Sequence, residues 1–350
     1  MLALVGLGVN GIGSISLSGN MTLRKSDIVY LDGYTTPIPQ NLVEKLCRQI
    51  GKQVIVLDRT GLEQGLGRII DEAKTNLVSV AVLGDPFFAT THLNFLIEAK
   101  KNNLSCKVIH NTSIASILTN SCGLHPYKFG RVTTIVREHG TPATSAYFAL
   151  YDNLIRGVHT TFLLEFDVEN NVGVSPLNAF NLLKDAEETY KLGAFSDETF
   201  VIVACRVERE DERFFAQKVG GLWKTDFGSP PYSIIVPSTL HFTEKEAICA
   251  LYGIDESVIT DNTQNIKRRT DFLVRKYIRK TRETLCEARG KLTKEKLREL
   301  DDLFENVECY LDDSTRFLNL GEEGLAMLSV GYAEGLLDSL RFQRVLDLRW

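Results

Sequence analysis

Short, almost entirely apolar segments alternate with helical ones along the first 258 residues, and this alternation constrains the fold more than any other feature. The segments are rich in β-branched residues, which is typical of strands that are covered on both faces. We expect strands at Leu2 to Val5, Ile28 to Leu31, Gln53 to Leu57, Val78 to Leu83, Cys106 to Ile109, Val132 to Val136, Thr160 to Phe166, Thr199 to Cys205 and Ser233 to Val236. Helices are expected between them, at Asn41 to Ile50, Thr91 to Lys101, Ser113 to Leu118, Ser175 to Leu192 and Thr243 to Gly253. The pattern predicts an α/β fold.

The chain of 350 residues is longer than one average domain. The segment from Arg137 to Ala146, with Gly140, Pro142 and little apolar content, is the expected linker between an α/β half at 1–136 and a second at 147–260. The last helix of the second half should begin with Thr243 as its N-cap and Glu246 as its capping-box partner.

Beyond residue 260 the strand pattern stops. Three helices are predicted there, at Ile266 to Arg289, Lys294 to about Phe317 and Gly321 to Leu340. Three glycines of the last helix, Gly324, Gly331 and Gly335, each cost ~1 kcal/mol of helix propensity, which is tolerable if a neighbouring backbone packs close. The sequence therefore predicts two α/β domains followed by an all-α three-helix appendage at 261–350.

Composition excludes several classes of protein. Hydrophobic residues make up 44% of the chain and charged residues 24%, which is typical of a globular protein. No apolar run approaches the ~20 residues that span a bilayer, and the N-terminus lacks the pattern of a signal peptide, so we expect a cytoplasmic protein with no membrane contact. The seven cysteines are scattered and include no Cys-x-x-Cys pair. They suggest neither a disulfide framework nor a zinc site, and we expect no bound metal.

The net charge of −5 hides a segregated C-terminal region. The stretch 266–298 holds 13 Lys or Arg against 4 Asp or Glu, whereas 299–323 holds 9 acidic residues against Arg316 alone. Two interpretations stay open. The two stretches form helices that neutralise each other, or the basic stretch docks on an acidic partner such as ribosomal RNA.

The string Gly84-Asp-Pro-Phe-Phe-Ala-Thr-Thr-His92 directly follows a predicted buried strand. It lies where ligands bind in open α/β sheets, just beyond the carboxyl end of a strand. Gly84 lets backbone approach a ligand, Asp85 can accept hydrogen bonds from it, and Pro86 stops the strand. Thr90 or Thr91 can cap the helix that follows.

The whole string resembles the diphthine synthase family, S-adenosylmethionine-dependent methyltransferases of the tetrapyrrole-methylase-like fold class. Other segments agree with that family in order, over roughly residues 1–258: Val5 to Gly8, Val108 to Ile114, Gly123 to Gly130, Gly157 to Thr160 and Asp226 to Tyr232. Farther along, Tyr310 to Phe317 and Gly331 to Asp338 resemble a small uncharacterised helical family from archaea.

The resemblance implies a fold, a cofactor and a reaction. The cofactor would be S-adenosyl-L-methionine, in the cleft between the two α/β halves. The residues at the family's cofactor positions are Val9, Asp85, Phe88, Ser113, Ile114, Leu164, Val207 and Tyr232. Tyr232 departs from the histidine common in archaeal members. The reaction would methylate the amino group of the 3-carboxy-3-aminopropyl-histidine of translation elongation factor 2, giving diphthine, in a homodimeric enzyme. The sequence identifies no general base.

Three histidines, His92, His110 and His159, lie in these motifs near predicted strand ends, and we expect them to orient loops through hydrogen bonds rather than to react. The aromatic residues Tyr127 and Phe129 are expected in the core or in a dimer contact rather than in a substrate cage.

Competing interpretations are retained. Gly6-Leu-Gly8-Val-Asn-Gly11 fits the dinucleotide fingerprint, with Asp32 at the spacing of a ribose ligand, so an oxidoreductase is the rival enzyme. The residues after Gly11 make a poor start for the long helix that a pyrophosphate requires, which counts against it. A methyltransferase acting on a small tetrapyrrole shares the expected fold, and a degenerate, non-catalytic binding module is the alternative from another class.

Overall fold

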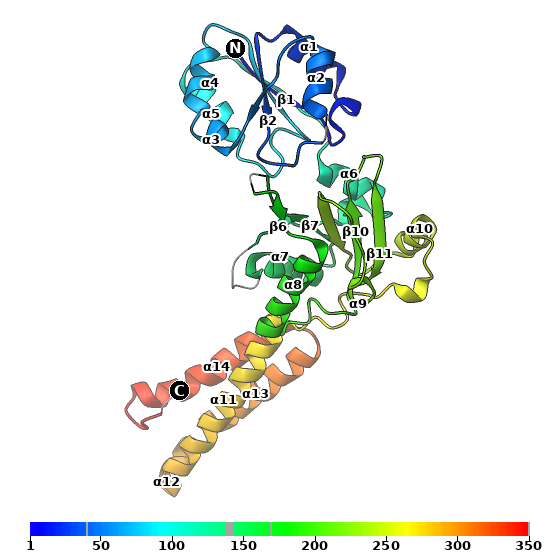
Figure 1. Ribbon diagram of the computed structural model, residues 1–350. Coiled ribbons are helices and arrows are strands. Elements are labelled where there is room, and N and C mark those ends of the chain that lie inside the picture. Colours follow the sequence, from blue (N-terminus) through cyan, green and yellow to red (C-terminus); the bar gives the residue numbers. More distant parts are fainter. Residues whose placement is uncertain (40, 138–142, 169, 349–350) are drawn as a thin grey trace. The chain divides into compact units, whose positions relative to one another are not determined.

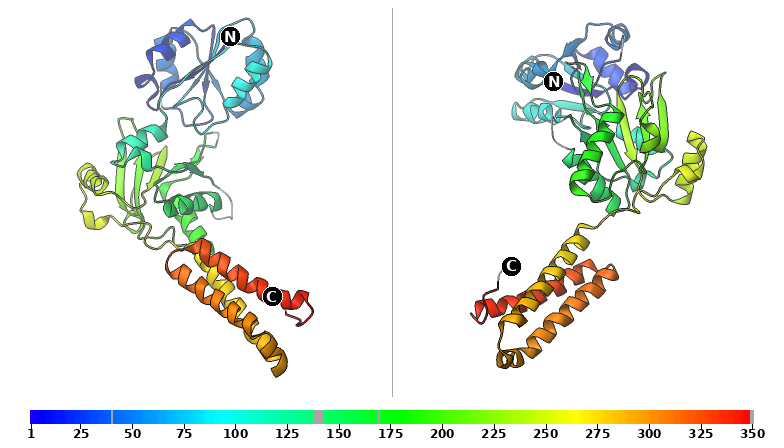
Figure 2. Two further views of the ribbon diagram at one scale, coloured as in Figure 1. Left: turned by 180° about the vertical axis from the view of Figure 1, so that it is seen from behind. Right: turned by 60° about the horizontal axis from the view of Figure 1, so that its bottom comes forward.

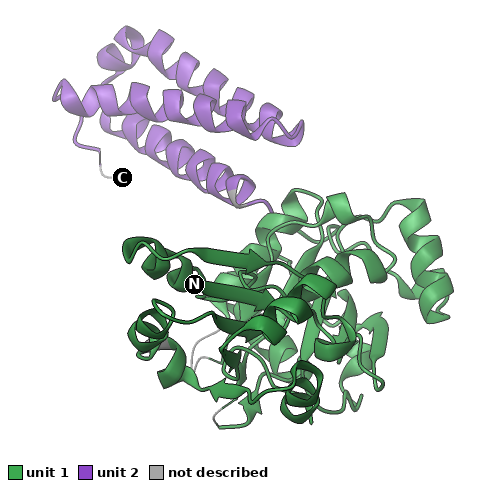
Figure 3. Ribbon diagram, turned by 90° about the horizontal axis from the view of Figure 1, so that it is seen from above, with its two compact units in different colours: residues 1–266 green, residues 267–350 purple. Residues whose placement is uncertain are grey.

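The computed structural model describes residues 1–39, 41–137, 143–168 and 170–348. The chain forms two compact units, Met1–Ile266 and Lys267–Trp350 (Figure 3). Each unit has its own buried core. The first unit is built on two sheets and the second on helices.

The first sheet is five-stranded and entirely parallel, with the order β3-β2-β4-β1-β5. Its strands are β1 (Leu2–Gly6), β2 (Ile28–Asp32), β3 (Ile55–Leu57), β4 (Val78–Val82) and β5 (Cys106–Ile109). Because side chains alternate across a strand, Leu2 and Leu4 enter the core on one face while Ala3 and Val5 enter the core on the other. Both faces are buried, as the all-apolar runs predicted.

Helices cover both faces of this sheet (Figure 1). Helices α1 (Leu17–Lys25) and α2 (Leu42–Ile50) pack on one face, while α4 (Leu66–Glu72) and α5 (Leu93–Lys101) pack on the other, next to the short α3 (Arg59–Glu63). The segment after Gly11 is a short 3-10 helix, and α1 begins only at Leu17 with Ser16 as its cap. This geometry lacks the immediate helix N-terminus of a dinucleotide site.

The second sheet is mixed, with the order β11-β10-β12-β7-β6. Its strands are β6 (Thr133–Ile135), β7 (Thr160–Leu164), β10 (Phe200–Cys205), β11 (Arg213–Lys218) and β12 (Tyr232–Val236). Strands β6 and β7 pair in parallel, and the other pairs are antiparallel. A small hairpin of β8 (Phe166–Asp167) and β9 (Val172–Gly173) follows β7.

This sheet is also covered on both faces. Helices α7 (Thr144–Ile155) and α8 (Pro176–Tyr190) share one core with it, and α6 (Ile114–Ser121) and α10 (Phe242–Tyr252) share the other. The short α9 (Val219–Leu222) follows β11, and 3-10 turns occupy Gly11–Gly13, Pro126–Lys128 and Glu256–Val258. The expected helix beginning with Ser175 has that residue as its cap, with a capping box to Asn178.

Three local expectations are corrected. Strand β6 belongs to the second sheet, so the chain passes from the first sheet to the second between β5 and β6. This crossing lies upstream of residue 136, the expected end of the first α/β half. Half of the expected linker, 138–142, lies outside the described residues, and its last residues already belong to α7. The capping box of α10 is formed by His241 and Glu244, not by Thr243 and Glu246, since a histidine ring takes the place of the usual hydroxyl.

The second unit is a bundle of α11 (Arg269–Lys291), α13 (Asp301–Asn319) and α14 (Glu323–Phe342), with the short α12 (Lys294–Glu299) between the first two (Figure 2). The second expected helix is thus broken at Leu300, and α11 continues through Gly290 rather than ending before it. Two ion pairs join the basic α11 to the acidic α13, Arg282 to Asp312 at 3.1 Å and Arg289 to Glu308 at 2.7 Å. They fit the interpretation that the two stretches neutralise each other. Within the described residues, no helix is long and apolar enough to cross a membrane.

Candidate functional site

A pocket of about 300 Å³ lies in the first unit, where loops at the carboxyl edge of the first sheet meet β7, β10 and β12 of the second. All eight residues that the sequence nominates line it: Val9, Asp85, Phe88, Ser113, Ile114, Leu164, Val207 and Tyr232. They come from separate segments that only the tertiary fold brings together. The edge is the one at which open α/β sheets bind ligands.

The loops that follow β1 and β4 are joined backbone to backbone. Gly8 and Gly84 exchange hydrogen bonds of 3.2 and 3.0 Å, and both have positive φ, +73° and +80°. A Cβ at Gly6 would lie 2.8 Å from the carbonyl oxygen of Gly84, so a side chain there would force the loops apart. Gly6 and Gly8, which belong to the dinucleotide-like motif, therefore bring two loops into contact beside the pocket residues Val9 and Gly84.

Asn111, in the loop after β5, ties these loops together. Its side-chain amide donates to the carbonyl oxygens of Gly6 and Ser14, both at 3.0 Å, and its backbone NH donates to Asp85. The next residues, Ser113 and Ile114, line the pocket at the start of α6, where Ser113 is the N-cap. One residue in the loop after β5 thus holds the segments that follow β1 and β4.

The carboxylate of Asp85 stays ionised at the pocket wall. One oxygen accepts the backbone NH of Phe87 at 2.9 Å, and the other lies 2.8 Å from Nδ1 of His110. Burial alone would raise the pKa of Asp85, but these hydrogen bonds, with that of Asn111, outweigh it and hold the pKa below its ordinary value. A fixed negative charge at this position suits a cationic ligand.

A buried pair, Asp32 and His92, anchors two further loops. Nε2 of His92 lies 3.2 Å from the carboxylate of Asp32, and both side chains are almost fully buried. Asp32 also accepts from the backbone of Tyr34 and Thr35 and from the hydroxyl of Thr35. Burial alone would raise the pKa of Asp32, but its contacts with His92, Thr35 and Tyr34 outweigh burial and lower the pKa. The loop after Asp32 supplies Thr35, Thr36 and Pro37 to the pocket.

The role of Asp32 is therefore not that of a ribose ligand. His92 also contacts the carbonyl oxygen of Pro86 at 3.1 Å, which fixes the Gly84 loop from behind. His92 is itself the N-cap residue of α5, without a side-chain cap, and Thr90 instead lies 3.0 Å from the His92 ring. The sequence prediction that a threonine caps this helix was wrong, whereas the loop-orienting role of His92 fits the structure.

The second sheet supplies the opposite wall, mostly apolar. Leu164 ends β7, Tyr232 begins β12, and Val207 follows β10. Buried Arg206 holds the adjoining segment, donating to the carbonyl oxygens of Phe227 and Ser229. Burial raises the pKa of Tyr232 and lowers that of Arg209, a pocket residue that sequence reasoning missed.

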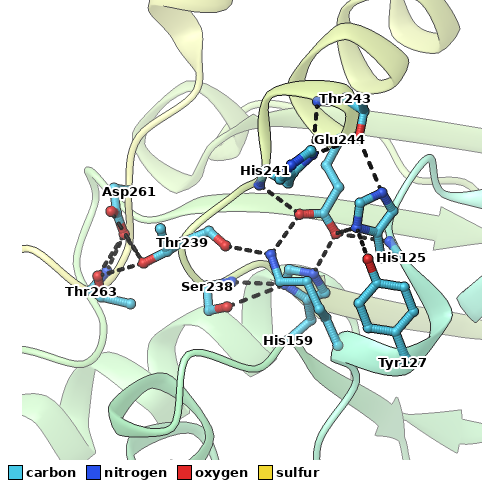
Figure 4. Close-up of polar contacts among 11 residues, drawn as sticks. His125, Tyr127, His159, Ser238, Thr239, His241, Thr243, Glu244, Asp261 and Thr263 are labelled. Carbon is cyan, nitrogen blue, oxygen red and sulfur yellow. Dashed lines mark hydrogen bonds and ion pairs between the residues drawn. The ribbon is translucent and has the colours of Figure 1, made fainter.

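At the ends of β7 and β12 that lie away from the pocket, a polar cluster surrounds the buried carboxylate of Glu244 (Figure 4). Glu244 accepts from Lys128, from Nε2 of His159 and from the backbone of His125 and His241. Nδ1 of His159 accepts the backbone NH of Ser238 at 3.0 Å, so His159 is a neutral, hydrogen-bonded ring that joins loops. Phe129 packs edge-on against it, while Tyr127 is 79% exposed.

Comparison with known proteins gives this architecture a family. The profile of the tetrapyrrole (corrin/porphyrin) methylases matches residues 1–222. A diphthine synthase of Methanothermobacter thermautotrophicus is 34% identical over 262 residues, which is 74% of this chain and 98% of the relative. The chain belongs to the diphthine synthase family. The diphthine synthase of Saccharolobus solfataricus is 36% identical over 256 residues, 71% of this chain and 97% of the relative.

Solved structures agree with the family assignment. A crystal structure of a diphthine synthase superposes with a TM-score of 0.63 and 27% identity, covering 74% of this chain and 99% of that chain. A conserved hypothetical protein from Aeropyrum pernix K1 superposes with a TM-score of 0.66 and 27% identity, covering 76% of this chain and 96% of that chain. The resemblance seen in the sequence is confirmed, and the chain is an S-adenosylmethionine-dependent methyltransferase of the diphthine synthase family.

The C-terminal unit matches a different family. Residues 276–346 fit a profile described as a protein of unknown function (DUF357). This match confirms that the appendage resembles an uncharacterised helical family. It covers most of α11 and all of α12, α13 and α14.

Proposed function

We propose that the pocket binds S-adenosyl-L-methionine and that the enzyme transfers methyl groups to the amino group of the 3-carboxy-3-aminopropyl-histidine of translation elongation factor 2. The observation that carries the proposal is the convergence of the eight nominated residues on one pocket. The two named diphthine synthases are matched over 98% and 97% of their length, which supports this reaction over methylation of a small tetrapyrrole. A cytoplasmic homodimer is part of the same proposal.

The chemistry of the lining fits this cofactor. Ile114, Leu164 and Val207 offer apolar surface for an adenine ring, and the ionised Asp85 offers a counter-charge for a cationic group. When bound, S-adenosylmethionine supplies a methyl group that its sulfonium has already activated. The protein's task is then to position the reactants and to exclude water, which rigidly held loops and apolar walls accomplish.

The lining also explains the absence of an obvious general base. Of the described residues that line the pocket, the ionisable ones are Asp85, Glu165, Arg209 and Tyr232. Asp85 has a lowered pKa and Tyr232 a raised one, so neither readily takes a proton near neutral pH, which leaves Glu165 as the remaining carboxylate of the lining. An amine substrate that arrives unprotonated needs no strong base, and its proton can leave through water.

Calorimetric titration with S-adenosylmethionine tests the cofactor part of the proposal. Leu164→Trp fills the pocket, and we expect at least a tenfold loss of affinity. Leu251→Trp is the matched control, because Leu251 is 58% exposed on α10, and it should bind as the wild type does. Equal affinity of all three proteins would show that the cofactor binds elsewhere.

A further inference from the structure

Helix α14 has a solvent face unlike those of the other helices in its unit. Its exposed residues are Gly324, Leu325, Leu328, Gly331, Tyr332, Gly335, Arg341 and Phe342. Only Arg341 is charged. Exposed residues of α13 are instead mainly Asp, Glu and Asn. A solvent-facing stripe on a surface helix is ordinarily polar, so this face has the composition of a helix contact.

The glycines on this face are unexplained within their own unit. A Cβ added to Gly324, Gly331 or Gly335 would meet no atom within 4 Å. Each glycine nevertheless costs the helix ~1 kcal/mol relative to alanine. Large apolar side chains stand beside them, with Leu328 56% and Tyr332 57% exposed. The expectation that a neighbouring backbone packs on these glycines therefore needs a partner from outside this helical unit.

Large residues on one side of the centre of the face correspond to small residues on the other side. In two antiparallel copies of a helix related by a two-fold axis, residues whose numbers have a constant sum lie opposite each other. With the axis between Gly331 and Tyr332, Leu328 of one copy faces Gly335 of the other, and Gly324 faces Ser339. A protruding leucine thus meets a glycine twice, and Gly331, which stands opposite Tyr332, lies one residue from its own copy, where it permits close approach.

The charges at the two ends favour the same orientation. The N-terminal end of α14 carries Glu322 and Glu323, and its C-terminal end carries Arg341 and Arg344. Within one chain Glu323 pairs with Arg268 and Arg341 pairs with Asp338, each at 3.0 Å, and between antiparallel copies Glu322 faces Arg341. An antiparallel pair places the acidic end of one helix beside the basic end of the other. It also places the two helix dipoles antiparallel, which is their favourable arrangement side by side. A parallel pair would place like charges side by side.

We propose that α14 is a self-association surface, on which the C-terminal units of two chains pair through antiparallel α14 helices with a two-fold axis between Gly331 and Tyr332. The occupant of the exposed face is thus a second copy of this chain. This contact belongs to the helical unit alone and is independent of the pocket and of the proposed methyl transfer.

Disulfide trapping in the full chain tests the register directly. The parent carries Cys286→Ser and Cys309→Ser, because both native thiols are exposed. In this parent, Gly331→Cys should cross-link to its own copy under mild oxidation, since the two thiols lie ~1.5 Å apart along the axis of the pair at 1.5 Å per residue. Leu325→Cys, on the same face, is the matched control, because its two copies lie ~20 Å apart along that axis. Cross-linking by the pair Leu328→Cys/Gly335→Cys, whose two positions lie on the exposed face and meet only between copies, would fix the antiparallel register.

A charge pair supplies the second test. Leu328→Glu in the Gly331→Cys background should lower the yield of cross-linked dimer at least tenfold, and Gly335→Arg added to it should restore the yield, because residues 328 and 335 face each other only between copies. Circular dichroism confirms that each variant is folded. Equal cross-linking at positions 331 and 325 would overturn the register. No cross-linking at 331 at micromolar concentrations would overturn the proposal.

Discussion

Glu244→Gln should destabilise the protein and remove a defined part of its acid sensitivity. The Glu244 carboxylate is completely buried and accepts Nζ of Lys128 at 2.6 Å, Nε2 of His159 at 3.0 Å and the backbone NH groups of His125 and His241, each at 2.8 Å. An amide in its place keeps the shape but loses the charge and presents an NH₂ group to donors. Three loops of the second sheet meet at this carboxylate.

The magnitude follows from the pKa. Burial alone would raise the pKa of Glu244, yet the hydrogen bonds outweigh it and lower the pKa from 4.5 to about 2. Each unit of this shift corresponds to about 1.4 kcal/mol, so the ionised carboxylate contributes on the order of 3 kcal/mol to folding. Because the folded pKa is depressed, this contribution is fully present above pH 4.5 and is lost as the pH falls toward 2.

Urea unfolding of the wild type and Glu244→Gln between pH 7 and pH 2.5 measures the effect. The difference in unfolding free energy should be about 3 kcal/mol at pH 7 and should shrink steadily below pH 4.5. Glu246→Gln, on the exposed side of the same helix, should match the wild type throughout. A difference below 1 kcal/mol at pH 7, or one that does not change with pH, would refute the reasoning.

Three further predictions concern the site and the C-terminal unit. Asp85→Ala should weaken S-adenosylmethionine binding by ~0.5 to 3 kcal/mol in a calorimetric titration. His110→Ala should have a smaller effect, because the His110 side chain is 66% exposed. Unchanged affinity of Asp85→Ala would remove Asp85 from the site. NADH and NADPH should not bind at micromolar concentrations, because the glycines after β1 hold two loops together and are followed by a short 3-10 helix rather than by the N-terminus of a long helix. Saturable quenching of fluorescence by either nucleotide would revive the oxidoreductase alternative. Removal of residues 267–350 should leave cofactor affinity unchanged, since every pocket residue lies upstream. The removal should raise the Michaelis constant for elongation factor 2, in a salt-dependent way, only if the basic stretch 266–298 docks on elongation factor 2.

The first sheet was predictable because its strands are buried on both faces and so read as continuous apolar runs. Leu2 to Val5 was expected and Leu2–Gly6 was found. Strand β11 was missed, since Arg213 to Lys218 mixes charged and apolar residues at the sheet edge and begins in a charged stretch. Helix α7 was partly mistaken for a linker because Gly140 and Pro142 lie just before it.

The candidate site was also predictable from the sequence only in part. Residues carried by local motifs, such as Asp85 in its turn, could be nominated from the sequence. Arg209, Thr35 and the pairing of Asp32 with His92 could not, because they depend on contacts between segments distant in the chain. Burial and partner atoms, rather than residue type, decide that Asp32 holds a loop instead of a ribose.

Mass spectrometry of elongation factor 2 tests the central claim most directly. The substrate carries the 3-carboxy-3-aminopropyl-histidine, and it is incubated with the full chain with and without S-adenosylmethionine. The account predicts whole methyl groups added to the peptide with that histidine, only when the cofactor is present and much more slowly with Leu164→Trp. Three added groups would mean full methylation of the amine, and a fourth would add a carboxyl ester. Binding of S-adenosylmethionine without any methyl gain on that peptide would contradict the proposed function.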